Sequence, residues 1–199
     1  MKKIAIYGGT FNPLHNGHVV ALQTIIDSEL FDEVHLMPSG VPPFKQDEAG
    51  TLIHRLEMSK IVCDNLKGII LNREEVDSEN LSYTYDTFIS LNNRYPNTKH
   101  YWTIGYDNLY NVETWYRGED LLSSLGFIIL NRGGYDKQDA MEKMNEFTTK
   151  YGTEFIQLDM PNIEISSSDV RLRVKNGKSI YGFVPDSISS YIQQNDLYI

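Results

Sequence analysis

The stretch that decides the fold is IAIYGGTFNPLHNGH, residues Ile4 to His18. Its apolar run, Ile4 to Tyr7, predicts a buried strand, and the end of the stretch opens a helical pattern. Two glycines, Gly8 and Gly9, lie where the strand ends. Glycine lets backbone approach a ligand closely, and the free N–H groups at the start of a helix favour an anion. The stretch therefore predicts a phosphate site between the first strand and the first helix.

The same alternation continues along the chain. Helical patterns cover residues 19–30, 52–66, 85–95 and 136–151, and each lies between two short apolar runs. Strands alternating with helices at this spacing predict an α/β fold, a Rossmann-like, doubly wound, mostly parallel sheet with helices on both faces. Ligands of such sheets bind beyond the carboxyl ends of the strands. The further predicted strands are Val34 to Met37, Ile69 to Leu71, Tyr101 to Ile104, Phe127 to Leu130 and Phe155 to Leu158.

The end of the chain has a different pattern. Two helical segments, Ser167 to Lys175 and Pro185 to Gln194, follow each other without a strand between them. A chain of 199 residues usually makes one domain, and no repeat or linker-like composition marks a second. We therefore expect a single domain over residues 1–199, with a Rossmann-like core over 1–160 and a small C-terminal helical part over 161–199.

Composition limits the classes of partner. Eighteen basic and 27 acidic residues give a formal charge of −9, which would repel a nucleic-acid backbone but still permits a local site for a small anion. The single cysteine, Cys63, excludes a disulfide within one chain. The apolar run near the amino terminus is too short for a signal peptide, and no segment could span a bilayer. We expect a soluble cytoplasmic protein without membrane or nucleic-acid partners; the oligomeric state stays open.

Two histidines flank the predicted start of the first helix. His15 and His18 are three residues apart, so both imidazoles can face one cleft. As paired donors they could bind phosphate oxygens whose charge rises in a transition state. One of them could instead be a satisfied structural histidine. A zinc site is a third reading, but no further Cys or His lies at ligand spacing, so we expect no metal ligands in the chain.

A second motif, ISSSDVR, covers residues Ile165 to Arg171. Ser166 with Asp169 fits a capping box, so the simplest interpretation is a well-capped helix. Arg171 lies within one helical turn of these hydroxyls. Hydroxyls, helix N–H groups and a guanidinium together suit the outer phosphates of a nucleoside triphosphate.

Both motifs resemble signatures of one enzyme superfamily. Residues 8–18 resemble the G-[GS]-[TS]-F-[DN]-P-x-H-x-G-H signature of the nucleotidylyltransferase superfamily, and Ile165 to Arg171 resembles the I-S-S-T-x-I-R motif that the superfamily uses on the β- and γ-phosphates of ATP. Ser168 replaces Thr and Val170 replaces Ile, which keeps the hydroxyl and the apolar contact. The implied ATP-binding residues are Gly8, Gly9, Thr10, Phe11, His15, His18, Gly105, Asp107, Ile165, Ser166, Ser167 and Arg171.

The middle of the chain indicates which family within this superfamily the sequence resembles. The segments 38–45, 82–87, 104–107 and 115–116, together with the ending, occur at the spacings of bacterial nicotinate-nucleotide adenylyltransferases, so that the resemblance covers nearly the whole chain. It implies that Trp115 stacks on the pyridine ring, while backbone around Tyr116 and Thr84 receives its carboxylate. Arg132 matches a basic position near the pyridine nucleotide. The alternatives are a core or interface aromatic for Trp115 and a solvated strand end for Arg132.

The resemblance implies an enzyme of NAD biosynthesis. It would transfer AMP from ATP to nicotinate mononucleotide, giving nicotinate adenine dinucleotide and pyrophosphate. His15 and His18 would hold the α-phosphate, Lys45 and Arg171 would offset negative charge, and Mg²⁺ would arrive with ATP. The alternatives are an adenylyltransferase that prefers nicotinamide mononucleotide or phosphopantetheine, and a nucleotide-binding module without catalysis.

Three residues depart from the family pattern. Asn12 stands where Asp is common, Phe44 where His often precedes the lysine, and Tyr106 at the small position of I-G-x-D. We expect Tyr106 to add bulk close to the adenine site, and all three to affect affinity or acceptor choice rather than activity. Elsewhere, His54 and Arg55 are interpreted as helix-capping and surface-pairing residues.

Overall fold

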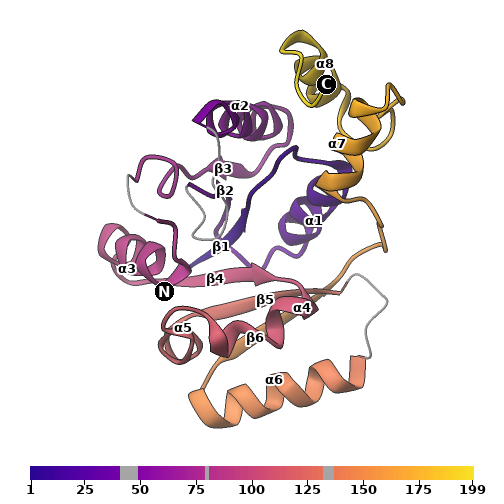
Figure 1. Cartoon of the computed structure of the whole chain (residues 1–199). Coiled ribbons are helices and arrows are strands. Elements are labelled where there is room, and N and C mark those ends of the chain that lie inside the picture. Colours follow the sequence, from indigo (N-terminus) through magenta and orange to yellow (C-terminus); the bar gives the residue numbers. More distant parts are fainter. Residues whose placement is uncertain (41–48, 79–80, 132–136) are drawn as a thin grey trace.

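The computed structural model describes residues 1–40, 49–78, 81–131 and 137–199 (Figure 1). Six strands form one sheet in the order β3-β2-β1-β4-β5-β6, and every neighbouring pair is parallel. The predicted fold class is thereby confirmed. The strands are β1 (Lys2–Gly9), β2 (Glu33–Pro38), β3 (Ile69–Leu71), β4 (Thr98–Ile104), β5 (Gly126–Asn131) and β6 (Glu154–Asp159).

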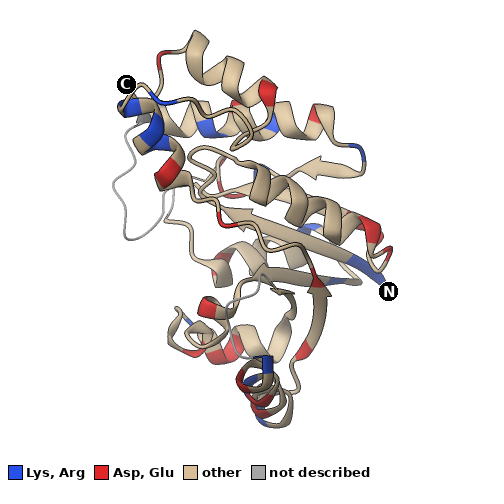
Figure 2. Cartoon of the chain, turned by 90° about the vertical axis from the view of Figure 1, so that its right-hand side faces the viewer, with Lys and Arg blue, Asp and Glu red and all other residues tan. Residues whose placement is uncertain are grey.

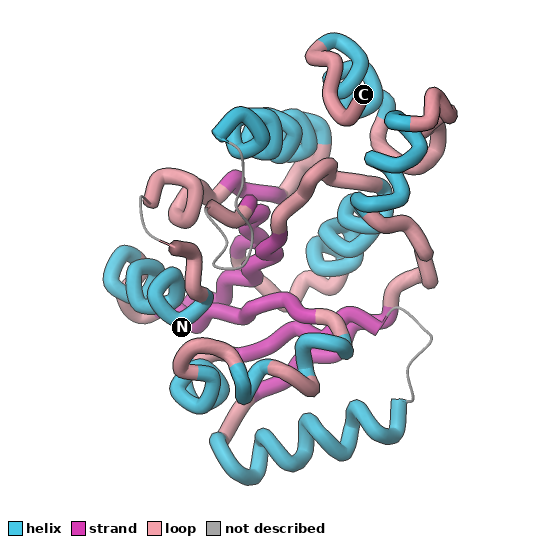
Figure 3. The backbone as a smooth tube through the Cα atoms, in the orientation of Figure 1, coloured by secondary structure: helices cyan, strands magenta, loops and turns pink. Residues whose placement is uncertain are grey.

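Helices pack on both faces of the sheet, as Figures 1 and 3 show. One face joins α1 (Asn16–Asp27), α2 (Ala49–Asn65), α7 (Ser167–Lys175) and α8 (Asp186–Gln194) in a hydrophobic cluster that we call the first core. The other face joins α3 (Thr84–Arg94), α4 (Tyr106–Leu109), α5 (Gly118–Ser124) and α6 (Lys137–Tyr151) in the second core. No helix in the described ranges is long and apolar enough to cross a membrane.

Strand side chains alternate between the two cores. In β1, Ala5 and Tyr7 belong to the first core, whereas Ile4 and Ile6 belong to the second. Successive side chains of a strand point to opposite faces, so a strand that is covered on both sides must be apolar at consecutive positions. This is why the apolar run at the start of the chain predicts a central strand.

The predicted helices and strands are all present, but some boundaries differ and one stretch was missed. Both α2 and β4 begin three residues before their predicted starts. The first helix ends at Asp27, three residues earlier than its apolar pattern suggested, and Leu30 lies 46% exposed beyond it. Between β4 and β5 the sequence interpretation missed α4, a 3₁₀ turn at Val112–Thr114, and α5. These segments contain 4, 3 and 7 residues, too few turns for a helical period to become visible.

The strand order positions the site. From β1 the chain crosses to β2 and β3 on one side, and the later strands continue from β4 on the other. In open α/β sheets a crevice for ligands forms beyond the carboxyl ends of the two strands at which this reversal occurs. Here those strands are β1 and β4, and β1 leads directly into the motif of residues 8–18.

Candidate active site

A cavity of about 190 Å³ lies at the carboxyl ends of β1 and β4. Pockets for complete ligands measure roughly 300–1,000 Å³, so this one would hold part of a nucleotide. Of the predicted ATP-binding residues, six line it, and they come from three elements and the first loop. The full lining is Tyr7, Gly8, Gly9, Phe11, His18, Thr103, Ile104, Gly105, Asp107, Asn108 and Leu130.

The two motif histidines lie against each other. The ring of His15, the N-cap residue of α1, stacks on the ring of His18 with 3.6 Å between centroids and 22° between planes. The backbone N–H of His15 donates to Nδ1 of His18 over 3.1 Å. A neutral imidazole that accepts at Nδ1 carries its proton on Nε2, and His18 is part of the cavity wall.

Aromatic packing fixes the orientation of His18. The ring of Phe11 meets the ring of His18 edge-on at 5.1 Å and stacks on Tyr7 at 5.7 Å. Phe11 is buried and has a left-handed backbone, with φ of 51°. A Cβ atom on Gly9 would lie 2.8 Å from the Phe11 ring. Glycine at position 9 therefore leaves the space in which Phe11 supports His18.

The second motif contacts the first loop directly. Ser167 Oγ donates to the carbonyl oxygen of Pro13 over 2.9 Å, and Arg171 Nη1 donates to that of Asn12 over 2.6 Å. Ser166 caps α7, as predicted, by accepting from the backbone N–H of Asp169 over 3.1 Å. The hydroxyls of Ser166 and Ser167 thus make hydrogen bonds within the protein. The guanidinium of Arg171 has five N–H donors, and among the described residues its recorded acceptors are Asn12 O and, at 3.1 Å, Ser168 Oγ.

The contacts of this loop include Asn12, one of the residues that depart from the family pattern. Asn12 Oδ1 accepts a 2.6 Å hydrogen bond from the hydroxyl of Tyr198, next to the last residue of the chain. Backbone and side chain of Asn12 are therefore both held by the C-terminal part. A neutral amide satisfies this contact without placing a negative charge beside a phosphate site.

The C-terminal part also brings positive charge to this edge of the sheet. Figure 2 shows basic segments on α7, near the C-terminus of an otherwise acidic chain. Arg171, Arg173 and Lys175 belong to this helix. Of these, Arg171 contacts the first loop, whereas Arg173 donates to Ser179 O over 2.7 Å and lies over the ring of Phe183, so Arg171 is the cation placed to suit a polyphosphate at this loop.

The residues predicted for the acceptor form a second group. Thr84 begins α3, next to Tyr83, whose ring lies 4.8 Å from the ring of Tyr116. Tyr116 is 52% exposed, whereas Trp115 is half-buried and packs against the second core. None of Thr84, Trp115 and Tyr116 lines the 190 Å³ cavity. The structure thus places six of the twelve predicted ATP-binding residues on the wall of this cavity, and these three acceptor residues are not part of that wall.

Four residues of the sequence analysis need separate statements. Lys45, Phe44 and Arg132 lie outside the described residues. The side chain of Tyr106 is 3% exposed, belongs to the second core and does not line the cavity, although its neighbours Gly105 and Asp107 do, so its effect on affinity stays a prediction. Burial raises the pKa of its hydroxyl, with Asp159 acting in the same direction. Tyr106 therefore adds apolar volume beneath the site rather than in it.

The interpretation of Arg55 is wrong. Its side chain is fully buried, and the guanidinium donates to backbone carbonyls of Thr10, Ser39 and Gly40. Its neighbour His54 instead meets Tyr191 of α8 through Nδ1 and the hydroxyl, 2.9 Å apart. No clear apolar face marks this helix in the sequence, and the burial of Arg55, three residues before the buried Met58, follows from the packing of the helix.

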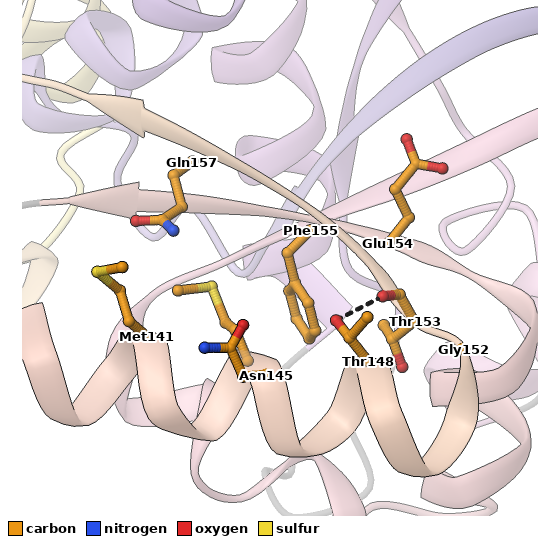
Figure 4. Close-up of a pocket in the computed structure, with 9 residues that line it drawn as sticks. Met141, Asn145, Thr148, Gly152, Thr153, Glu154, Phe155 and Gln157 are labelled. Carbon is orange, nitrogen blue, oxygen red and sulfur yellow. Dashed lines mark hydrogen bonds between the residues drawn. The ribbon is translucent and has the colours of Figure 1, made fainter.

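Two larger cavities lie away from the strand ends. One, of about 450 Å³, opens between α6 and β6, where Met141, Asn145 and Gln157 are part of the wall (Figure 4). Its charged residue, Glu154, accepts hydrogen bonds from Lys99 and Tyr101. The other, of about 480 Å³, lies between the end of α7 and α8. Within the described ranges, no group of three or more His, Cys, Asp or Glu residues could hold a metal ion.

Comparisons with known proteins show which family the chain resembles. The profile of the cytidylyltransferase-like family matches residues 6–173. A nicotinate-nucleotide adenylyltransferase of Bacillus subtilis (strain 168) is 36% identical over 199 residues, covering 100% of this chain and 99% of that protein. A probable nicotinate-nucleotide adenylyltransferase of Clostridium perfringens (strain 13 / Type A) is 34% identical, with 100% and 98% covered.

A solved structure shows the same fold. It is the Plasmodium falciparum nicotinic acid mononucleotide adenylyltransferase complexed with NaAD, with a TM-score of 0.81 and 24% identity over 100% of this chain and 98% of that chain. Similarity at this level of identity supports the architecture of the six-stranded sheet and its flanking helices.

Proposed function

This chain belongs to the cytidylyltransferase-like family and, within it, to the nicotinate-nucleotide adenylyltransferases, and from this membership we propose the reaction that it catalyses. It transfers the adenylyl group of ATP to nicotinate mononucleotide, yielding nicotinate adenine dinucleotide and pyrophosphate in NAD biosynthesis. The observation that carries the proposal is the direct contact between the two motifs, Ser167 to Pro13 and Arg171 to Asn12, beside the cavity at the end of β1.

We propose an in-line displacement at the α-phosphorus of ATP. An oxygen of the 5′-phosphate of nicotinate mononucleotide forms the new P–O bond, and the bond to the bridging oxygen of pyrophosphate breaks. The protein needs no nucleophile, so positioning and charge stabilisation supply the rate. The Nε2–H of His18 and the imidazole of His15 would hold the α-phosphate, and Arg171 and Lys45 would offset charge on the leaving pyrophosphate. The substrate would be the Mg²⁺ complex of ATP.

The remaining nucleotide contacts would come from the rest of the cavity wall. Gly105 and Asp107, at the start of α4, would meet the adenosine portion. Gly8, Gly9, Thr10 and Phe11 would follow the phosphates along the first loop. Ile165, Ser166 and Ser167 would act at the β- and γ-phosphates, where helix N–H groups and hydroxyls are suited to oxygen anions.

The acceptor would bind on the side of α3. There the half-buried indole of Trp115 offers a flat apolar face for a pyridine ring. Backbone N–H groups near Tyr116 and Thr84 would receive the carboxylate, and Arg132 would lie near the phosphate or carboxylate of the mononucleotide. N–H donors suit a carboxylate better than a carboxamide, which favours the acid over the amide acceptor.

The test is an acceptor comparison. Pyrophosphate release is measured with MgATP and, separately, nicotinate mononucleotide, nicotinamide mononucleotide and phosphopantetheine. We expect the highest kcat/KM with the first. A preference for the amide or for phosphopantetheine would overturn the choice of acceptor. Tight ATP binding without product from any acceptor would overturn catalysis and leave a nucleotide-binding module.

Other properties stay predictions from the sequence. They are a single domain over residues 1–199, a cytoplasmic location, and the absence of nucleic-acid or membrane partners. The acidic composition supports the prediction against nucleic acid, because a net charge of −9 repels a phosphate backbone.

A further inference from the structure

A buried guanidinium joins two loops at the active-site edge of the sheet. Arg55, on α2, is fully buried, and its Nη1 donates to Thr10 O over 3.0 Å and to Ser39 O over 2.7 Å, while Nη2 donates to Gly40 O over 3.1 Å. Thr10 belongs to the loop after β1, and Ser39 and Gly40 follow β2. One planar group therefore fixes the distance between the backbones of two loops that are almost thirty residues apart in the sequence.

A buried carboxylate continues this connection toward α3. Glu75 is 7% exposed, and its Oε1 accepts from Thr87 Oγ1 over 3.0 Å. Burial raises the pKa of Glu75, while hydrogen bonds from Thr87 and the backbone N–H of Gly40, together with the charge of Arg55, oppose the rise. Thr87 lies one turn from Thr84, the first residue of α3. Gly40 thus contacts both Arg55 and Glu75.

Gly40 is packed so closely between them that there is no room for a side chain. A Cβ atom at position 40 would lie 2.0 Å from the backbone oxygen of Glu75. The backbone N–H of Ser39 also donates to Gly9 O over 2.8 Å, which ties the same segment to the end of β1. Movement of the Thr10 loop would therefore shift the segment after β2, and through Glu75 the start of α3.

Burying charged groups is costly, and apolar side chains of similar volume often stabilise a fold equally well. A guanidinium has one property that apolar residues lack, since its fork holds several oxygens in a fixed plane. In the proposed reaction the first loop holds ATP and the start of α3 holds the acceptor. In-line transfer depends on their separation, because a displacement of about 1 Å can cost 10²-fold in rate.

We propose that Arg55 and Glu75 are positioning residues, which set the ATP loop and the acceptor-binding start of α3 at the separation that in-line adenylyl transfer requires. The proposal rests on the proposed function. Neither residue touches substrate, and each acts through backbone or through Thr87. Both substrates should therefore be affected together when either residue is changed.

The experiment compares Arg55→Lys and Glu75→Gln with two matched controls, Arg73→Lys and Glu142→Gln, which replace exposed residues. For each protein, kcat and the KM values for MgATP and nicotinate mononucleotide are measured below the melting temperature and referred to the folded fraction. We expect Arg55→Lys to lower kcat/KM for both substrates about tenfold or more, Glu75→Gln to do so about threefold or more, and the controls to match the wild type.

Unchanged kinetic constants per folded molecule, with only a lower melting temperature, would show that the pair is merely structural and overturn the proposal. So would a change in the KM of one substrate alone. If Arg55→Lys does not fold, Glu75→Gln decides by the same criteria. The wild type, assayed in parallel with all three acceptors, tells separately whether the proposed function holds, and the variants are then compared on whichever acceptor it uses.

Discussion

The loop on the proposed nucleotide side and the tyrosine cluster on the proposed acceptor side are held by different contacts. On the nucleotide side, Arg55, Ser167 and Arg171 donate hydrogen bonds to backbone carbonyls of the first loop at 2.6 to 3.0 Å. On the acceptor side, Tyr83 and Tyr85 meet Tyr116 through ring contacts at centroid distances of 4.8 and 6.2 Å.

This difference has a physical consequence. Hydrogen bonds to backbone fix the path of a loop, which suits groups that must meet a reacting phosphorus in one geometry. Ring contacts are less directional, and a half-exposed ring can shift to fit another flat ligand. We infer that catalytic chemistry depends on the nucleotide side and acceptor selectivity on the acceptor side. The following three substitutions test this division, beginning with the largest expected effect.

Replacing His18 by Ala should lower kcat by about 10²-fold or more, because it removes a donor whose interaction strengthens in the transition state. The melting temperature should change little, since His18 is only partly buried. Steady-state kinetics and thermal unfolding measure the two effects. His54→Ala is the matched control, because His54 contacts Tyr191 rather than the first loop. Unchanged turnover in the His18 variant would remove that residue from the mechanism.

The local arrangement of the two motifs could be predicted from the sequence, whereas the long-range contacts that hold the first loop could not. Both motifs contain functional groups in a fixed local order, so the positions of His15, His18 and Arg171 relative to their helix starts follow from the chain alone. The contacts of Arg171 with Asn12 and of Tyr198 with Asn12 span 159 and 186 residues. Contacts over such separations depend on the packing of whole elements, which a local pattern does not contain.

Arg55 and Tyr106 show the same limit of prediction from local sequence patterns. Each is a residue whose type suggests the surface or a ligand site, and each is buried by its neighbours. For Arg55 the sequence of α2 shows no clear apolar face that would reveal the burial. For Tyr106, α4 has only four residues and therefore shows no period.

Replacing Trp115 by Ala should raise the KM for nicotinate mononucleotide about tenfold, with a smaller change in the KM for MgATP. Loss of an aromatic platform removes stacking and apolar contact on the acceptor alone. Trp115→Phe keeps a ring and should lie between the variant and the wild type. Equal increases in both KM values would instead identify Trp115 as a core aromatic whose loss disturbs the whole site.

The smallest expected effect concerns stability beneath the acceptor side. His100 on β4 is 3% exposed, its ring lies 6.3 Å from the rings of both Phe88 and Tyr95, and neither ring nitrogen has a hydrogen-bond partner among the described residues. Burial lowers the pKa of His100, and the nearby His35 acts in the same direction. His35 has partners at both ring nitrogens, Glu33 and Asn72, but burial lowers its pKa as well and Glu33 only opposes this, so His35 adds to the same acid sensitivity.

Lowering the pH should therefore reduce the free energy of unfolding through the buried His100. Below about pH 6.5 the unfolded chain protonates at this position while the folded protein does not, so the free energy of unfolding falls with pH until the lower pKa of the folded state is reached. One proton changes that free energy by at most about 1.4 kcal/mol per pH unit, which corresponds to a few degrees in melting temperature. Thermal unfolding between pH 8 and pH 5 measures the slope.

His100→Phe should flatten this slope, because an apolar ring in the same place has nothing to protonate. His54→Phe, a replacement at a half-buried histidine on the other face of the sheet, should keep the wild-type slope. If both variants lost stability with acid as steeply as the wild type, His100 would not be the source. Flattening in the His100 variant alone would locate the acid-sensitive packing under α3, on the side that we assign to acceptor selectivity, and separate it from the hydrogen-bonded first loop.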